Sequence, residues 1–184
     1  MKQIIPCKFA VVVFCLFIFC AEQLTQAQPE AIPTKVLVRA ISRDAKVIGT
    51  KVGGARISIR DASTGEVLAE GIQTGSTGNT ELIMVKPRER GAKVFDTPGT
   101  AGFLATLNLE RPTVVEITAE GPLQPPQSTY SASKTLLLIP GQDVLGEGIL
   151  LEIHGFRVTL LTPEEAFQRS SGEDLEVRVA VTMT

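Results

Sequence analysis

The chain has 184 residues, of which 43% are apolar, 21% charged and 5% aromatic, and its formal net charge is -2. A chain of this length holds one domain or at most two small ones, and its apolar content is too high for a disordered protein. The near balance of charge excludes the strongly basic surface by which proteins bind nucleic acid or an anionic membrane.

The N-terminus has the pattern of a secretion signal. Lys2 and Lys8 precede an unbroken apolar run at 9–21, and a polar stretch then leads to the small residues Thr25 and Ala27. This order predicts cleavage near Ala27 and a periplasmic or secreted protein. The apolar run is shorter than the roughly 20 residues of a membrane-spanning helix, so an uncleaved anchor is the weaker alternative.

All three cysteines, Cys7, Cys15 and Cys20, lie within residues 1–27. The mature chain is therefore expected to have no disulfide, and its stability must come from a hydrophobic core. Residues 28–34 contain two prolines and no periodicity, which predicts an extended leader before one domain at 35–184. The lack of a mature cysteine and of an Asn-x-Ser/Thr acceptor favours export from a bacterium.

From Lys35 onward, short apolar runs with period-two alternation are broken by Gly, Pro, Asp and Ser about every ten residues. This pattern predicts an all-β sandwich of about eight to ten strands with one short helix. The expected strands are 35–42, 56–61, 66–70, 81–86, 103–109, 113–120, 133–139, 148–154, 156–161 and 175–182.

The alternation is cleanest in 56–61, 103–109 and 175–182, where one face should be buried and the other exposed to solvent. In the third of these, the face expected to be buried carries Leu175, Val177, Val179 and Val181.

Two other features refine the strand predictions. The apolar pairs Leu137-Leu138 and Leu150-Leu151 suggest central strands covered on both sides. Gly155 predicts a bulge in one long strand or a tight corner between two.

One short helix is expected after the ninth strand. Thr162 can cap its first turn, Pro163 suits the first helical position, and Glu165 stands at the reciprocal capping position. The segment predicts a connector of one or two turns, with Phe167 inserted into the core.

The longest irregular stretch, 86–102, exceeds a usual connection, and such loops are either functional or mobile. Its basic residues could bind an acidic partner or a polysaccharide, although a solvated loop is the alternative. A second candidate contact surface is 124–130, which prolines would hold extended. The predicted partner contacts are Lys86, Arg88, Arg90, Lys93 and Tyr130.

The order of turns and strands resembles a known family. A Gly-Gly-Ala at 53–55 leads into an alternating strand, an Asp-x-x-Thr-Gly turn follows at 61–65, and a Thr- and Gly-rich corner closes at 74–78. This looks like the front half of a transthyretin-like or carboxypeptidase-regulatory-like domain, and 113–121 resembles the strand on which those domains end. The resemblance covers about residues 45–121 and implies an Ig-like or transthyretin-like sandwich without implying an activity.

The chain departs from that family at two places. Pro112 and Thr113 stand where the family has a Tyr before the late strand. The chain ends in Val-Thr-Met-Thr and has one His, whereas the hydroxyisourate-hydrolysing branch of the family uses His and Arg side chains and a Tyr-Arg-Gly-Ser end. That enzymatic activity is therefore not expected.

Catalytic chemistry lacks its usual residues. His154 is the one imidazole, and it shares a predicted strand face with Glu152, but no Gly-x-Ser-x-Gly elbow supplies a nucleophile. A solvated histidine at a strand end is the favoured interpretation.

Metal and phosphate sites are also disfavoured. The mature chain offers Met84 and Met183 but no cysteine, and its acidic pairs at 164–165 and 173–174 suit a helix cap and a turn. The GSTGNT run at 75–80 has the composition of an anion nest but lacks a phosphate-loop lysine, so a hairpin turn is predicted there.

These observations predict an exported, non-catalytic module without cofactor or metal that binds a protein or cell-surface partner. It should not bind nucleic acid, and it should have no membrane span after signal cleavage. The alternative is a secreted hydrolase or lyase that acts on a polysaccharide with carboxylates alone, since Asp and Glu are plentiful.

Overall fold

The computed structural model of the chain describes residues 30–43, 45–124, 129–154, 156–162, 172 and 174–183. The chain divides into Met1–Glu30 and Ala31–Thr184, and nearly all described residues belong to the second part. The expected signal, Gly155, and the expected helix beyond Thr162 with its Phe167 lie outside the described residues.

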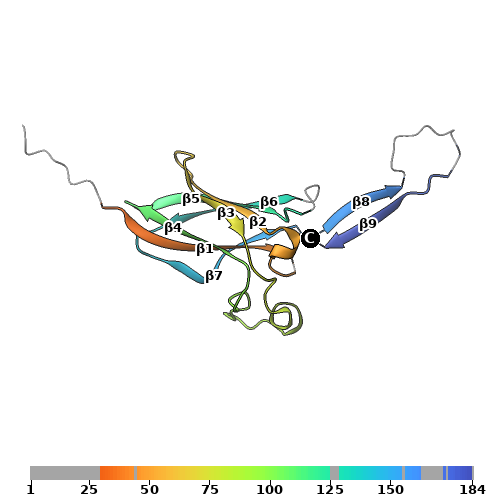
Figure 1. Cartoon of the computed structure of the whole chain (residues 1–184), viewed down its shortest axis with the longest axis horizontal. Coiled ribbons are helices and arrows are strands. Elements are labelled where there is room, and N and C mark those ends of the chain that lie inside the picture. The colour runs from red at the N-terminus through yellow and green to blue at the C-terminus, as the bar shows by residue number, and fades with distance from the viewer. Residues whose placement is uncertain are drawn as a thin grey trace, which may run out of the picture. The chain divides into compact units, whose positions relative to one another are not determined.

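The strands of the described residues are β1 (Ile32–Ser42), β2 (Ala55–Asp61), β3 (Val67–Gln73), β4 (Phe103–Leu109), β5 (Thr113–Gly121), β6 (Tyr130–Leu138), β7 (Val144–Ile153), β8 (Phe156–Thr162) and β9 (Arg178–Met183). They form a three-stranded sheet in the order β4-β1-β7, a four-stranded sheet in the order β3-β2-β5-β6, and a two-stranded sheet, β8-β9 (Figure 1). Neighbouring strands are antiparallel except β1 and β7, which are parallel. The all-β, sandwich-like prediction is confirmed.

The main core lies between the two larger sheets, because alternate residues of their strands point inward. On β2, Ile57 and Ile59 are fully buried, while Arg56 and Arg60 are exposed. Each such aliphatic side chain contributes roughly 1.5–3 kcal/mol on burial. The same alternation buries Ala105, Leu107 and Leu109 on β4 and Val115, Ile117 and Ala119 on β5.

A second apolar cluster covers the outer face of the β4-β1-β7 sheet. It combines Ile41 of β1 and Leu150 of β7 with residues of the connection 74–102, which we call the covering segment. The covering segment contributes Ile83, Val94, Phe95 and Ala101, each 7% exposed or less. Within 86–102, Val94, Phe95 and Ala101 therefore pack on the sheet, whereas the basic residues are exposed, as the solvated-loop alternative expected: Lys86, Arg88, Arg90 and Lys93.

Residues 81–86, expected as a strand, instead contain the short π-helix Glu81–Val85. The side-chain oxygen of Asn79 accepts hydrogen bonds from the backbone N–H groups of Glu81 and Leu82 at 3.0 and 3.2 Å, so it caps the first turn. The expected hairpin turn at 75–80 is wrong as well, since this run leads from β3 into the helix. A short apolar run fits either a strand or a helical turn, and the preceding cap decides here.

The first strand begins at Ile32, three residues before the expected start at Lys35. Thr34 is fully buried, and its hydroxyl accepts a hydrogen bond from the backbone N–H of Gly141 at 2.9 Å. The end of the predicted leader therefore belongs to the sheet.

The prediction of two central strands from paired leucines is wrong, because β6 and β7 both lie at sheet edges. On β6, Leu137 is 54% exposed. On β7, Leu150 is half-buried, since the covering segment packs over the outer face of its sheet.

The parallel pairing of β1 with β7 depends on Gly148. Its φ is +72°, and a Cβ added there would lie 2.4 Å from the carbonyl oxygen of Leu37. We expect Gly148→Ala to lower the free energy of unfolding by about 2 kcal/mol, as measured by urea titration, because steric overlap adds to left-handed strain. Gly91→Ala is the control, because its φ is +83° and no atom lies within 4 Å of the added Cβ. Equal losses in the two variants would contradict the steric argument.

Candidate functional site

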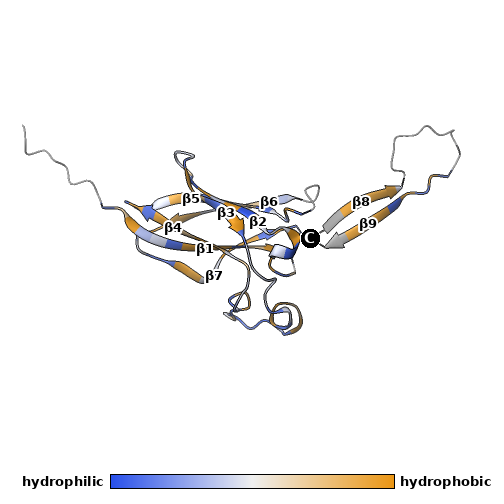
Figure 2. Cartoon of the chain, viewed as in Figure 1, coloured by the Kyte–Doolittle hydropathy of each residue, from blue (hydrophilic) through white to orange (hydrophobic). Residues whose placement is uncertain are grey.

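The ribbon formed by β8 and β9, which we call the C-terminal ribbon, exposes an apolar face. Val158 pairs with Val181 and Leu160 pairs with Val179, so these cross-strand neighbours share one face. Their exposed fractions are 64%, 58%, 53% and 51%, respectively. Figure 2 shows apolar residues on both strands of the ribbon. Contiguous exposed apolar side chains of this kind mark interaction surfaces.

The prediction that this face of 175–182 is buried is wrong, and the strand itself covers only part of that range. The strand β9 begins at Arg178, three residues after the expected start, so of the four residues expected on this face only Val179 and Val181 lie in it. All four of Leu175, Val177, Val179 and Val181 are exposed rather than buried. A strand face is buried only when another layer packs on it, and the exposed fractions show that no described layer covers this face. An isolated two-stranded ribbon is marginally stable in water.

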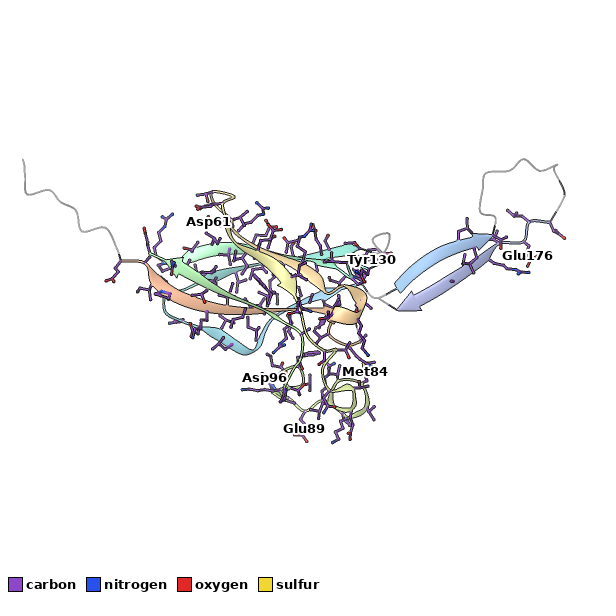
Figure 3. The ribbon with its side chains drawn as sticks, in the orientation of Figure 1. Asp61, Met84, Glu89, Asp96, Tyr130 and Glu176 are labelled. Carbon is purple, nitrogen blue, oxygen red and sulfur yellow. The ribbon has the colours of Figure 1, made fainter. Side chains whose placement is uncertain are left out.

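The charged residues near β9 lie at alternate positions, away from the apolar face. The guanidinium Nε of Arg178 donates a hydrogen bond to the carboxylate of Glu176 at 2.7 Å, and both side chains are exposed (Figure 3). Within the described part of the ribbon, the apolar face therefore carries no charged side chain, and it would recognise a partner by apolar packing.

The predicted basic contacts all lie on the covering segment, and two of them already interact within it. The Lys86 ammonium is 3.1 Å from the carboxylate of Glu81, and both are exposed. The guanidinium of Arg88 lies 5.3 Å from the centroid of the Phe95 ring and donates a hydrogen bond to the Ile83 carbonyl at 3.2 Å. Arg88 thus holds parts of the covering segment together.

Arg90 and Lys93 are exposed on the same segment. Acidic residues Glu89 and Asp96 lie on it as well (Figure 3). The covering segment therefore presents both signs of charge, which weakens its case as a site for a strongly acidic partner.

A buried arginine lies beneath the covering segment. Arg39 of β1 is 5% exposed, and it donates hydrogen bonds to the carbonyls of Thr100 at 3.0 Å, Ala101 at 2.6 Å and Glu147 at 3.2 Å. Burial lowers the pKa of Arg39, while the negative charges of Asp96 and Glu147 oppose that shift, and an arginine remains charged in any case.

Glu147 of β7 extends the same network. Its carboxylate accepts hydrogen bonds from the backbone N–H groups of Val94 and of Phe95, the latter at 2.9 Å. Asp96 lies 3.9 Å from the Arg39 guanidinium. These contacts of Arg39 are all made within the chain, so this arginine fastens the covering segment to the sheet instead of binding a ligand.

Tyr130 and the histidine lie together in a different place. A shallow, open depression is lined by Glu120, Thr129, Tyr130, Ser131 and His154. Figure 3 shows Tyr130 at one end of the β3-β2-β5-β6 sheet. The structure thus brings Tyr130 close to Glu120 and His154, whereas the four basic contacts lie on the covering segment.

The depression has a mixed polar lining that includes one carboxylate. That carboxylate, Glu120, lies 3.8 Å from the Arg56 guanidinium. Glu152 and His154 are both exposed on either side of the buried Ile153, as expected of one strand face, and the Glu152 carboxylate lies 3.8 Å from the Arg43 guanidinium. A carboxylate-only hydrolase needs two carboxyl groups that converge on one bond, and the lining of this depression does not supply the second.

Two further properties bear on the kind of site. Among the described residues, no three His, Cys, Asp or Glu side chains gather as metal ligands would. No helix in the described part of the chain is long and apolar enough to cross a membrane.

Comparison with known proteins assigns no residue a role. No protein family, curated protein or solved structure matches the chain significantly. The candidate site therefore rests on physical features, of which the apolar face of the C-terminal ribbon is the strongest.

Proposed function

We propose that this chain is an exported, non-catalytic β-sandwich module that binds a protein or cell-surface partner through the apolar face of its C-terminal ribbon. The exposure of Val158, Leu160, Val179 and Val181, each above 50%, carries the proposal. Burying the exposed half of each side chain is worth about 1 kcal/mol, so covering the face is favourable.

The scaffold supports this proposal. The two larger sheets have a filled core, and their outer surface includes a covering segment fastened by buried hydrogen bonds. Such a rigid unit can present a binding element without chemistry of its own. Export is part of the proposal and rests on the signal-like pattern at 1–27.

The likeness to transthyretin-like and carboxypeptidase-regulatory-like domains is also part of the proposal. The Asp-x-x-Thr-Gly turn is built as such a motif requires, because the Asp61 carboxylate accepts hydrogen bonds from the backbone N–H groups of Ser63 at 2.7 Å and Thr64 at 3.1 Å. The hydrogen bond from the Ser63 hydroxyl, followed by these two backbone hydrogen bonds, lowers the pKa of Asp61. The motif supports a scaffold and carries no activity.

A photo-crosslinking side chain placed at Val158 or Val179 in the full chain tests the proposed function in the cells that produce it. We expect discrete adducts from both positions, because an apolar face in use is covered by its partner. Thr106, exposed on β4, is the control position and should give none. Adducts of the same pattern from all three positions, or none from the ribbon, would refute binding through this face.

A further inference from the structure

We propose that the peptide bond between Arg90 and Gly91 is a processing site for a protease that cuts after basic residues. The site belongs to the covering segment and is independent of what the C-terminal ribbon binds. Three features support it: the exposure of this bond, the protection of the basic residues around it, and the way the two larger sheets join the products of the cut.

The bond lies in an exposed turn. Every residue of 84–93 is exposed, and the backbone N–H of Ala92 donates a hydrogen bond to the Glu89 carbonyl at 3.1 Å across the turn. Gly91 has a φ of +83°, and no atom lies within 4 Å of a Cβ added there. Figure 3 shows Glu89 on the side of the covering segment away from the sheets. A protease must draw the chain into an extended form, and opening this turn uncovers no buried apolar residue, so the opening is easy.

The side chain of Arg90 is available to a protease. It is exposed, and it forms no hydrogen bond or ion pair with any described residue. A protease that cuts after basic residues binds the side chain in a pocket that carries a carboxylate. The Arg90 guanidinium can therefore enter such a pocket without breaking a contact to the described part of the chain.

Two of the other basic residues in the segment are protected. Lys86 is followed by Pro87, whose ring and missing N–H hinder cleavage of the bond between them. The guanidinium of Arg88 contacts the Phe95 ring and donates a hydrogen bond to the Ile83 carbonyl, so it must leave both to enter a protease.

The third, Lys93, precedes a buried residue. Val94 is 7% exposed, and its backbone N–H donates a hydrogen bond to the Glu147 carboxylate. Cutting after Lys93 would require Val94 to leave the second apolar cluster, which loses the burial of its side chain. Of the four basic residues of this segment, Arg90 alone combines a free side chain with an accessible bond after it.

Cleavage adds water across the Arg90–Gly91 bond. The C–N bond breaks, the hydroxyl of the water goes to the Arg90 carbonyl carbon, and its hydrogen goes to the Gly91 nitrogen. The proton of the new acid then passes to the new amine, which leaves a carboxylate and an ammonium group. Nothing is oxidised or reduced, and the protease is the catalyst.

The two products should stay together as one folded protein. The first carries β1, β2 and β3, and the second carries the described strands from β4 to β9. Both larger sheets need strands from both products, because β1 pairs with β4 and β7 while β2 pairs with β5. Each new end also keeps an anchor in the second apolar cluster, since Ile83 precedes the cut and Phe95 follows it. The cut therefore opens the connection without separating the sheets.

Limited digestion of the folded full chain with trypsin tests the site. Within 30–162 we expect the first cut at Arg90–Gly91, identified by mass spectrometry, and the products should elute together on size exclusion and separate in urea. Arg90→Gln should slow cleavage of the covering segment by at least roughly tenfold, because its other basic residues need a larger local opening. Lys93→Gln removes the same charge on the other side of the bond, and this matched control should be cut at the unchanged rate.

The chain recovered from the cells that produce it gives the second measurement. We expect a product that begins at Gly91 in mass spectrometry of its termini, and this product should be missing from Arg90→Gln. A first cut elsewhere within 30–162, products that separate without urea, or a cell-derived chain with no terminus at Gly91 would each overturn the inference. None of these results changes the crosslinking expected from the C-terminal ribbon, so the two proposals fail separately.

Discussion

Replacing Arg39 with Met should lower the free energy of unfolding by about 4 kcal/mol, because it removes one partner of a buried charged network. The carbonyls of Thr100, Ala101 and Glu147 lose their donor, and the Glu147 carboxylate loses the nearby positive charge. Met fills a similar volume, so the loss reports on polar contacts more than on a cavity. Urea unfolding followed by circular dichroism measures it.

Arg56→Met is the control for this prediction. Arg56 also lies near two carboxylates, those of Glu70 at 3.9 Å and Glu120 at 3.8 Å, but its side chain is 53% exposed. Exposed ion pairs are worth roughly 0–1 kcal/mol, so this variant should lose little. A loss similar to that of Arg39→Met would show that burial of the network does not set its strength.

The Arg39→Met variant should also loosen the covering segment. The Arg39 guanidinium donates hydrogen bonds to Thr100 and Ala101 of the covering segment and to the carbonyl of Glu147 on β7. The Glu147 carboxylate in turn accepts hydrogen bonds from Val94 and Phe95 of the same segment. Cleavage by a protease within 86–93 should therefore become faster in Arg39→Met before the core unfolds.

The sandwich strands could be predicted from the sequence because their alternation is local. The expected strand at 103–109 matches β4, and those at 56–61 and 113–120 match β2 and β5 to within one residue at each end. Period-two alternation shows which residues share a face, and in these strands one face meets the opposite sheet.

The same alternation could not reveal what covers each face. Val179 and Val181 alternate as regularly as Ile57 and Ile59, yet the first pair is exposed and the second is fully buried. The difference depends on whether another sheet lies opposite, which is a long-range property.

The covering segment was missed for the same reason. Val94 and Phe95 stand in a stretch rich in Gly, Pro and charge, which resembles a loop until the bare sheet face beneath it is known. One local signal was present, since Arg39 interrupts the apolar run Val-Leu-Val-Arg-Ala-Ile of β1. A charge on a strand with apolar residues on both sides indicates a buried polar partner.

Gln73 at the end of β3 joins the two larger sheets through its side chain. It is fully buried, and its Oε1 accepts a hydrogen bond from the Ala40 N–H at 2.7 Å. Its Nε2 donates to the carbonyls of Ala40 at 3.0 Å and Ile48 at 2.8 Å. The pairing of β4 with β1 ends at Val38, so the amide takes the place that a neighbouring strand would occupy beside Ala40.

Gln73→Leu should lower the free energy of unfolding by about 3 kcal/mol, because it leaves the Ala40 N–H and the Ile48 carbonyl unpaired in the interior. The Ala40 carbonyl still accepts a hydrogen bond from the Ile48 N–H at 3.0 Å, so losing the bond from Gln73 costs less at this carbonyl than at that of Ile48. Thermal and urea unfolding measure the change, and Gln142→Leu at an exposed turn is the matched control, expected within roughly 0.5 kcal/mol of the unchanged chain. If the two variants were equally stable, the buried amide would be replaceable by apolar packing, and the two sheets would be held together by their shared core alone.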